Sequence, residues 1–182
     1  MQDTKSVIKY IKSDVYRYFG KCSIGFIIRY YFKSYMVRFH VALRMRHGSG
    51  IVKFIGRILW RLNKTKRTIQ IDPNMEIGYG LYIGHGGPLV VSSSAVIGNN
   101  VNLSQFTTIG SNHGKAAQIG DFTYIGPNVC IVEDVKVGSN STIGAGTVVT
   151  KDVPENATVA GVPAKVLNYN NPGRFVNRRW SI

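Results

Sequence analysis

The chain has 182 residues, 44% of them hydrophobic, which is enough to bury a core and argues against intrinsic disorder. Its formal net charge is +14, yet residues 1–67 hold sixteen Lys or Arg against two acids, whereas residues 68–182 hold seven of each sign. The imbalance is confined to the first third of the chain. This argues against a uniformly basic nucleic-acid-binding domain and indicates a surface or a polyanion as partner of that end.

The first segment, residues 1–67, is predicted to be a basic, aromatic-rich α-helical region. Apolar residues at helical spacing in 7–18 and 51–62 mark two amphipathic helices, and the Gly-containing residues 47–50 mark a break before the second. Between them, residues 26–45 mix aromatic residues with Arg and Lys. Two interpretations stay open: peripheral docking on an anionic membrane, or a solvated helical face.

The beginning of the chain predicts no secretion or membrane span. Residues 1–6 lack the basic and apolar regions of a signal peptide, and charged residues interrupt the apolar stretch 22–43. We therefore expect a cytoplasmic protein that can lie peripherally on the inner face of a membrane. Cys22 and Cys130 fit neither a disulfide framework nor a zinc site and are expected to be free, buried thiols.

From residue 68 onward, a six-residue repeat organises the chain. The steps are six residues throughout, except for eight between Ile83 and Val91 and ten between Ile109 and Ile119. The repeated aliphatic residues are Ile71, Ile77, Ile83, Val91, Ile97, Leu103, Ile109, Ile119, Ile125, Ile131, Val137, Ile143 and Val149. Each hexad predicts a short strand with the aliphatic side chain inside, and a following Gly for the tight corner. Three hexads would close one triangular coil, giving four to five coils with loops at 84–90 and 111–118.

This repeat resembles that of the hexapeptide acyltransferase family, over about residues 69–168. The resemblance implies a mainly β fold, a left-handed parallel β-helix of hexapeptide repeats with an N-terminal α-helical region. It divides the chain into a helical region (1–67), a β-helix acetyltransferase domain (68–168) and a C-terminal tail (169–182). Members are usually homotrimers with active sites between adjacent prisms, so we expect a homotrimer here.

His85 is the candidate general base. Its context, residues 80–91 (GLYIGHGGPLVV), resembles the serine acetyltransferase branch of the family, in which a His of this loop acts on the acceptor hydroxyl. An alcohol is a poor nucleophile at neutral pH and needs such a base. A backbone N–H of the 84–87 loop would stabilise the oxyanion, and Gly86 and Gly87 of this loop are assigned to substrate binding. The alternative is a His that merely caps a turn.

The carboxylate that usually supports this base is displaced. In serine acetyltransferases it lies fifteen positions upstream of the His, where this chain has Gln70. Either Asp72, two residues later, assumes the role, or the base works with a neutral partner. The family's aspartate also orients serine, so its replacement by Gln70 in the substrate site weakens serine as the acceptor.

His113 is a second candidate for contact with the substrate. Asn112-His113 resembles the Asn-His pair of the xenobiotic acetyltransferase branch, where the His is itself the base. In a trimer, His85 of one chain could face His113 of the next. A solvated loop His is an equal alternative.

The acyl donor implied by resemblance is acetyl-CoA. Residues 143–154 and 160–165 resemble the terminal coil of acetyl-CoA-dependent members, where small residues admit the pantetheine arm and Lys suits the phosphates. The residues assigned to this cofactor are Gly126, Pro127, Ala145, Gly146, Thr150, Lys151, Ala160 and Lys165. Alternatively, these Gly and Ala residues only turn corners. Neither cysteine has a visible activating base, so no acyl-enzyme is expected.

The function predicted from the sequence is acetyl-CoA-dependent O-acetylation of a hydroxyl, on a sugar of a capsular or surface polysaccharide precursor. Gln70 and the short, basic helical region favour this acceptor over serine. The alternative is serine O-acetyltransferase of cysteine biosynthesis, which the terminal Ile182 favours because that family inserts such a residue into its partner enzyme.

Two other function classes are weaker. Zinc carbonic anhydrases on the same fold need three imidazoles around each metal, whereas the repeat region holds only His85 and His113, so no metal is predicted. A non-enzymatic scaffold that binds membranes or polyanions through residues 1–67 would not need His85. No nucleic-acid partner is expected.

Overall fold

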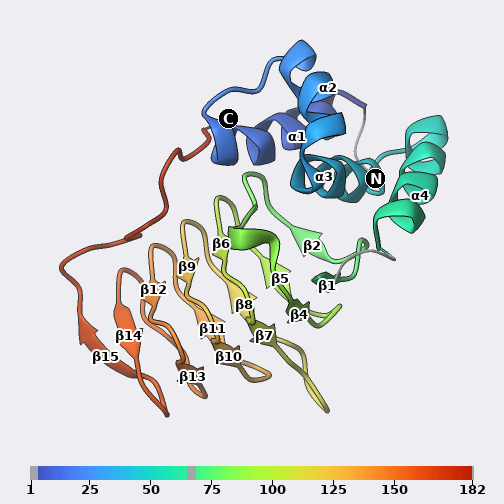
Figure 1. Ribbon diagram of the computed structural model, residues 1–182. Helices are drawn as coiled ribbons and strands as arrows, with labels where there is room; N and C mark the ends of the chain where they lie inside the picture. The colour runs from blue at the N-terminus through green and yellow to red at the C-terminus, as the bar shows by residue number, and fades with distance from the viewer. Residues whose placement is uncertain (1–3, 65–68, 182) are drawn as a thin grey trace.

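The computed structural model describes residues 4–64 and 69–181, and it places a helical region beside a parallel β-helix (Figure 1). The helices are α1 (Thr4–Phe19), α2 (Ile24–Lys33), α3 (Tyr35–Met45) and α4 (Gly50–Lys64). Helices α1 and α4 confirm the two amphipathic patterns. Ser34 ends α2 and begins α3, and its hydroxyl accepts a hydrogen bond from the Val37 N–H at 3.4 Å, which caps α3.

Three sheets form the sides of the β-helix, which makes about five coils. The first sheet contains β1 (Ile69–Ile71), β4 (Leu89–Val91), β7 (Thr108–Ile109), β10 (Cys130–Ile131) and β13 (Val148–Val149). The second contains β2 (Glu76–Ile77), β5 (Val96–Ile97), β8 (Gln118–Ile119) and β11 (Lys136–Val137). The third contains β3 (Tyr82–Ile83), β6 (Asn102–Leu103), β9 (Tyr124–Ile125), β12 (Thr142–Ile143), β14 (Thr158–Ala160) and β15 (Lys165–Asn168). Only the β14–β15 pair among these strands is antiparallel, and it closes the far end.

The repeat residues form the core of the β-helix. All thirteen aliphatic positions are buried, and none is more than 6% exposed. Their register places each above its equivalent one coil earlier, as in Val91 paired with Ile109 and Ile109 paired with Ile131. The predicted β-helix of hexapeptide repeats with an N-terminal helical region is confirmed.

The corner glycines have a different role from the one expected. The residue with left-handed backbone lies three positions after the aliphatic residue, as at Asn100 (φ 54°) and Asn140 (φ 57°), rather than at the Gly that follows it directly. A Cβ at Gly98 would lie 2.9 Å from the Asp121 nitrogen, and one at Gly138 would lie 2.5 Å from the Glu155 nitrogen. The expectation that these glycines take the tight turn is therefore wrong. Gly98 and Gly138 are required because the next coil's backbone passes too close for a side chain, whereas a Cβ at Gly110 would meet nothing within 4 Å.

Small hydroxyl residues satisfy the backbone at several corners. Thr107, Thr123, Ser141 and Thr147 are buried, and each side chain donates to the carbonyl three residues earlier, at 2.6–2.8 Å. An unpaired carbonyl in this interior would be destabilising, so these hydroxyls explain the small residues found at this position of the repeat.

A buried ion-pair network joins the helical region to the first coil. The Asp14 carboxylate accepts two hydrogen bonds from the Arg44 guanidinium, at 2.7 and 2.9 Å, and one from the Leu81 N–H at 2.8 Å. His40 Nδ1 lies 3.0 Å from the same carboxylate. Arg44 also donates to the carbonyls of Ile77 and Gly78. The hydrophobic core is likewise continuous between α3, α4 and the β-helix. The boundary predicted at 67/68 lies outside the described residues.

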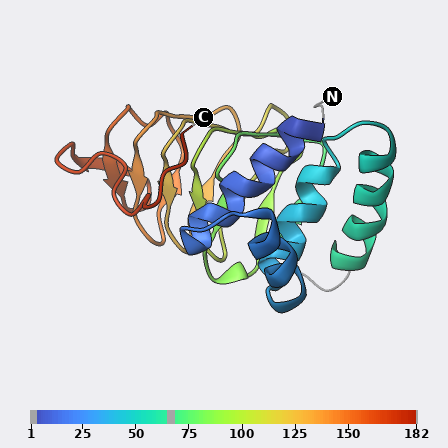
Figure 2. The same ribbon diagram turned by 90° about the horizontal axis from the view of Figure 1, so that it is seen from above.

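The C-terminal tail returns along the third sheet to α1 (Figures 1 and 2). The Gly173 N–H donates to the Asn140 carbonyl at 2.6 Å, and the Trp180 N–H donates to Asn100 Oδ1 at 2.7 Å. Arg178 reaches the Tyr18 carbonyl. Ile182, which the serine alternative invoked, lies outside the described residues.

Cys130 is exposed and Cys22 is half-buried, so the expectation of buried thiols is wrong: Cys130 occupies the outward position of β10. Within residues 4–64 and 69–181, no helix is long and apolar enough to cross a bilayer.

Candidate functional site

One edge of the β-helix carries a column of stacked turns, where strands of the third sheet lead into strands of the first. Backbone hydrogen bonds join successive turns, from the Asn128 N–H to the Gln105 carbonyl at 3.1 Å and from the Gly146 N–H to the Pro127 carbonyl at 2.8 Å. The predicted site residues on this edge are His85, Gly86, Gly87, Gly126, Pro127, Ala145, Gly146 and Ala160. We call it the catalytic edge. The candidate base and the small residues assigned to the donor therefore share one line along the molecule.

Two tyrosines of the helical region hold the His85 turn. Tyr18 accepts a hydrogen bond from the Ile83 N–H at 2.8 Å, and its hydroxyl lies 3.1 Å from the Ile83 carbonyl. The Tyr35 hydroxyl donates to the His85 carbonyl at 3.2 Å. His85 is exposed and has left-handed backbone (φ 56°), which is uncommon for a non-Gly residue. Sequence reasoning missed both tyrosines, because contacts between residues fifty or more positions apart leave no local pattern.

The glycines beside His85 are required by close packing. A Cβ at Gly86, which also has left-handed backbone (φ 53°), would collide with the Tyr35 hydroxyl. A Cβ at Gly87 would lie 2.6 Å from Gln105 Cβ. Substitution of either glycine would therefore displace the turn that carries His85.

Farther along the catalytic edge, the surface is open and lined by small residues. Ala145 and Gly146 are exposed, and a Cβ built at Gly146 would meet nothing within 4 Å. A Cβ at Gly126 would lie 2.9 Å from the Ala145 nitrogen, so this turn must be Gly for the coils to stack. The Ala145 turn is three strand spacings from the His85 turn, or about 14 Å. This strip can accept an extended thioester arm with its acyl end toward His85.

The two predicted partners of His85 lie on the first sheet. Gln70 points outward from the middle of β1 and lines a shallow pocket of about 540 Å³ with Asp72 and Val90. Asp72 follows β1 at the edge of this sheet opposite the catalytic edge. Its Oδ1 accepts hydrogen bonds from the backbone and side-chain nitrogens of Asn74, at 2.8 and 3.0 Å. No hydrogen bond or ion pair joins the described side chains of Asp72 and His85 within one chain.

A carboxylate that sequence reasoning missed organises the His113 loop. Glu133 Oε2 accepts hydrogen bonds from the N–H groups of Asn112, His113 and Gly114, at 2.8–2.9 Å. These three donors lower the pKa of Glu133 to about 2. The His113 side chain is 91% exposed, with Nδ1 3.9 Å from Glu133 Oε1. The sequence did offer one signal for this contact. Ile131 stacks on Ile109 in the next coil, so Glu133, two residues after Ile131, lies beside the loop that follows Ile109.

Two of the three remaining predicted donor residues, Thr150 and Lys151, lie away from the catalytic edge. Thr150 and Lys151 are exposed directly after β13, on the same edge as the His113 loop. Lys165 is exposed at the start of β15, paired with Ala160. Within one chain, the structure does not bring Thr150, Lys151 or His113 to His85. The two groups occupy opposite edges of the first sheet.

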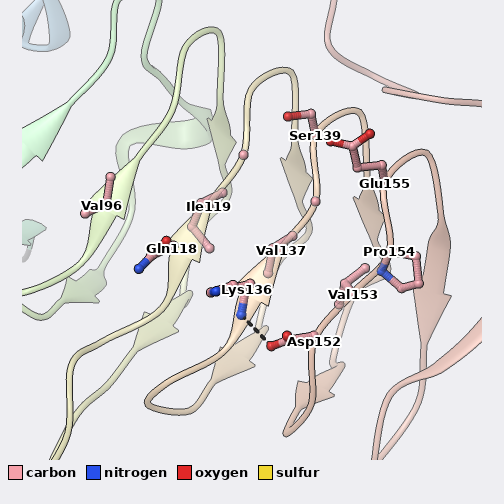
Figure 3. Close-up of a pocket in the computed structure, with 12 residues that line it drawn as sticks. Val96, Gln118, Ile119, Lys136, Val137, Ser139, Asp152, Val153, Pro154 and Glu155 are labelled. Atoms are coloured by element: carbon pink, nitrogen blue, oxygen red, sulfur yellow. Dashed lines mark hydrogen bonds between the residues drawn. The ribbon is translucent and has the colours of Figure 1, made fainter.

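A separate groove lies on the outer face of the second sheet. It has a volume of about 520 Å³, and its walls include Lys136, Asp152 and Glu155. Figure 3 shows Asp152 beside Lys136 on the next coil, where its Oδ1 accepts the Lys136 N–H at 2.8 Å. None of the predicted site residues lines this groove. Among the described residues, no cluster of three or more His, Cys, Asp or Glu could hold a metal ion.

Comparison with known proteins matches both the repeat and the fold. The family described as "Bacterial transferase hexapeptide (six repeats)" matches residues 116–151. Together with the fold, this match confirms the resemblance to hexapeptide-repeat acetyltransferases.

Several relatives of the chain are serine acetyltransferases. The enzyme of Bacillus subtilis is 33% identical over 129 residues, covering 69% of this chain and 58% of the relative. The Escherichia coli enzyme is 36% identical over 111 residues, covering 58% and 41%. A crystal structure of Neisseria gonorrhoeae serine acetyltransferase in complex with serine has a TM-score of 0.68 at 29% identity, covering 91% of this chain and 70% of that one. The chain thus spans less than two thirds of the length of the Bacillus subtilis and Escherichia coli enzymes.

Proposed function

We propose that the protein is an acetyl-CoA-dependent O-acetyltransferase of the serine acetyltransferase type. The observation that carries the proposal is the catalytic edge, where exposed His85 stands at one end of an open strip formed by small residues such as Ala145 and Gly146. The likeness to serine acetyltransferases, which include structures complexed with serine and with CoA, supports this assignment of donor and acceptor.

In the proposed reaction, His85 takes the proton of the acceptor hydroxyl as its oxygen attacks the thioester carbonyl. N–H groups of the turn at Gly86 and Gly87 stabilise the negative charge on the carbonyl oxygen. Attack on the carbonyl forms a tetrahedral intermediate. Its collapse breaks the carbon–sulfur bond and expels the CoA thiolate, which takes the proton from the His85 imidazolium. Tyr18 and Tyr35 position the turn and take no proton.

The similarity to these relatives favours serine over a sugar as the acceptor. The polysaccharide sugar expected from the sequence is not supported by them, because those described above are serine acetyltransferases. We therefore propose serine, or a small molecule that presents its hydroxyl in the same way. Gln70 would then offer a neutral amide to the substrate rather than a carboxylate.

We also propose that the working site is shared between copies in a homotrimer. The catalytic edge carries His85 and the small residues, whereas the opposite edge of the first sheet carries His113, Thr150 and Lys151. Apposition of these two edges in neighbouring chains would complete one donor site and bring His113 toward the acceptor.

The test is an assay of acetyl transfer to L-serine, in which the free thiol released from acetyl-CoA is measured. His85→Ala should lower kcat by a factor of about 10²–10⁴, the usual contribution of a general base. Asn170→Ala, in the exposed tail, is the control and should keep the wild-type rate. A wild-type rate in His85→Ala would refute the assignment of the base. Faster transfer to oligosaccharides than to serine would refute the acceptor.

A further inference from the structure

Helix α4 presents an apolar stripe to solvent. Five side chains at helical positions i, i+3, i+4, i+7 and i+11 are between 41% and 68% exposed. They are Ile51, Phe54, Ile55, Ile58 and Leu62. The opposite face, with Gly56 and Trp60, packs against α3 and the core. Figures 1 and 2 place α4 at the outer margin of the helical region, so nothing among the described residues covers this stripe.

A basic stripe runs beside the apolar one. Lys53, Arg57 and Arg61 follow one another at four-residue spacing along α4, and the two arginines are exposed. Within residues 4–64, Asp14 is the single acidic residue, and it is buried against Arg44. The solvent-facing surface of the described helices therefore carries cationic and no anionic side chains.

The arginines of α4 also border a pocket. Arg57 and Arg61 line a hollow of about 520 Å³ together with Arg46 and Asp72. The Asp72 carboxylate is engaged by Asn74, and Arg46 Nε is buried with no hydrogen-bond partner among the described residues. Guanidinium groups facing an open hollow suit a phosphate, which accepts paired hydrogen bonds from them.

This combination favours one occupant. A second copy of α4 would bring two cationic stripes together, which like-charge repulsion opposes. A nucleic acid would satisfy the arginines but would leave five large apolar side chains in water. An anionic lipid surface matches both stripes, because headgroup phosphates meet the basic residues while the apolar side chains enter the acyl boundary.

We propose that α4 is an in-plane membrane anchor, which docks the helical region on an anionic phospholipid surface. Ile51, Phe54, Ile55, Ile58 and Leu62 lie in the acyl boundary, and Lys53, Arg57 and Arg61 lie at the headgroups. A lipid phosphate occupies the hollow between Arg46 and Arg61. The proposal is independent of the acetyltransferase assignment, because none of these side chains lies on the catalytic edge.

The primary experiment is co-sedimentation of the full chain with vesicles. We expect binding to vesicles of equal parts phosphatidylcholine and phosphatidylglycerol, and weak binding to phosphatidylcholine alone. Arg57→Gln combined with Arg61→Gln should weaken binding about 30-fold, from roughly 1 kcal/mol per basic residue at an anionic surface. Phe54→Ser combined with Ile58→Ser should abolish it.

Matched controls come from the β-helix and its closing β14–β15 hairpin. Val162→Ser with Leu167→Ser removes two apolar side chains that are 72% and 61% exposed, and Lys115→Gln with Lys136→Gln removes two exposed charges. Both control pairs should bind vesicles as the wild type does. Circular dichroism of every variant checks that the fold is retained.

Depth of insertion gives a second readout. The fluorescence of Phe54→Trp should be quenched by brominated lipids in anionic vesicles, whereas that of Leu167→Trp should not, and the native Trp60 and Trp180 supply the same background in both. Three outcomes would overturn the proposal: no binding to anionic vesicles, equal loss in the control pairs, or a change in oligomeric state from the Phe54 and Ile58 substitutions without vesicle binding.

Discussion

Among single side chains, Glu133 shows how one carboxylate can order a whole loop. Its Oε2 accepts hydrogen bonds from the three successive backbone N–H groups of residues 112–114, and these donors lower the pKa of Glu133 from 4.5 to about 2. A depressed folded-state pKa means that the carboxylate supports the loop fully above about pH 4.5. That support is lost as the pH falls through about 2.

We expect Glu133→Gln to loosen the loop at neutral pH, because a neutral amide oxygen is a weaker acceptor than a carboxylate. Amide hydrogen exchange should accelerate at Asn112, His113 and Gly114 and stay slow in the adjoining strands β7 and β10. Asp152→Asn is a control, since that exposed carboxylate accepts the backbone N–H of Lys136 instead. Equal exchange at residues 112–114 in Glu133→Gln and wild type would contradict the assigned role.

The turns of the catalytic edge leave an open strip because their exposed residues have small side chains or none. Ala145 is exposed in the turn between β12 and β13, and Gly146 leaves the space beside it open. A large side chain there would fill the strip proposed for the thioester arm without disturbing the buried core.

Ala145→Trp is therefore expected to raise KM for acetyl-CoA at least about tenfold while leaving the melting temperature unchanged, a loss on the order of 1.4 kcal/mol in donor binding. Steady-state kinetics and thermal unfolding measure the two effects. Glu155→Trp is the matched control, because Glu155 is exposed at the same position of a hexad on another edge. A normal KM in Ala145→Trp would place the donor elsewhere.

The β-strands were predictable because their signal is local and periodic. Each inward residue, such as Ile97 or Ile125, sits at a fixed spacing, and a slip of one residue would turn it toward solvent. Helix α4 was predictable as a helix, but not in its orientation, since apolar residues line both its buried and its exposed faces. Only the packing of α3 and Trp60 decides which face is covered.

The candidate site was predictable in part, for a related reason. Resemblance pointed to His85 and the small turns, whose sequence strings are contiguous. The supports were not visible, because Tyr18, Tyr35 and Glu133 reach their loops from distant positions. Asp72 was predicted as the partner because it is close to Gln70 in sequence. However, β1 runs away from the catalytic edge, so a residue two positions after Gln70 lies at the far edge of the sheet.

Over the whole molecule, the Asp14 network joins the helical region to the first coil of the β-helix, so we expect the two parts to unfold together. Burial alone would raise the pKa of Asp14, but the charges and hydrogen bonds of Arg44 and His40 outweigh it and hold the pKa below 3.8. The carboxylate thus contributes stability that is present above pH 3.8 and lost as the pH falls through its lower folded-state pKa.

At neutral pH, Asp14→Asn should lower the free energy of unfolding by about 3–5 kcal/mol, because it leaves the buried Arg44 charge without its partner. Urea unfolding followed by circular dichroism measures the loss, with Asp152→Asn as an exposed carboxylate control. The helical and β signals should shift together in one transition. Separate transitions in the wild type would show that the two parts unfold independently.

The return of the tail to α1 bears on how such a stack can come apart. A solenoid whose coils touch only their neighbours can fray from a free end, one coil at a time. Here, Trp180 packs on Tyr16 of α1 and Arg178 binds the Tyr18 carbonyl, so the last residues described are fastened to the first helix. The linear stack is thereby closed into a ring of contacts. We therefore expect the terminal coil to fray only after these contacts between the tail and α1 are broken.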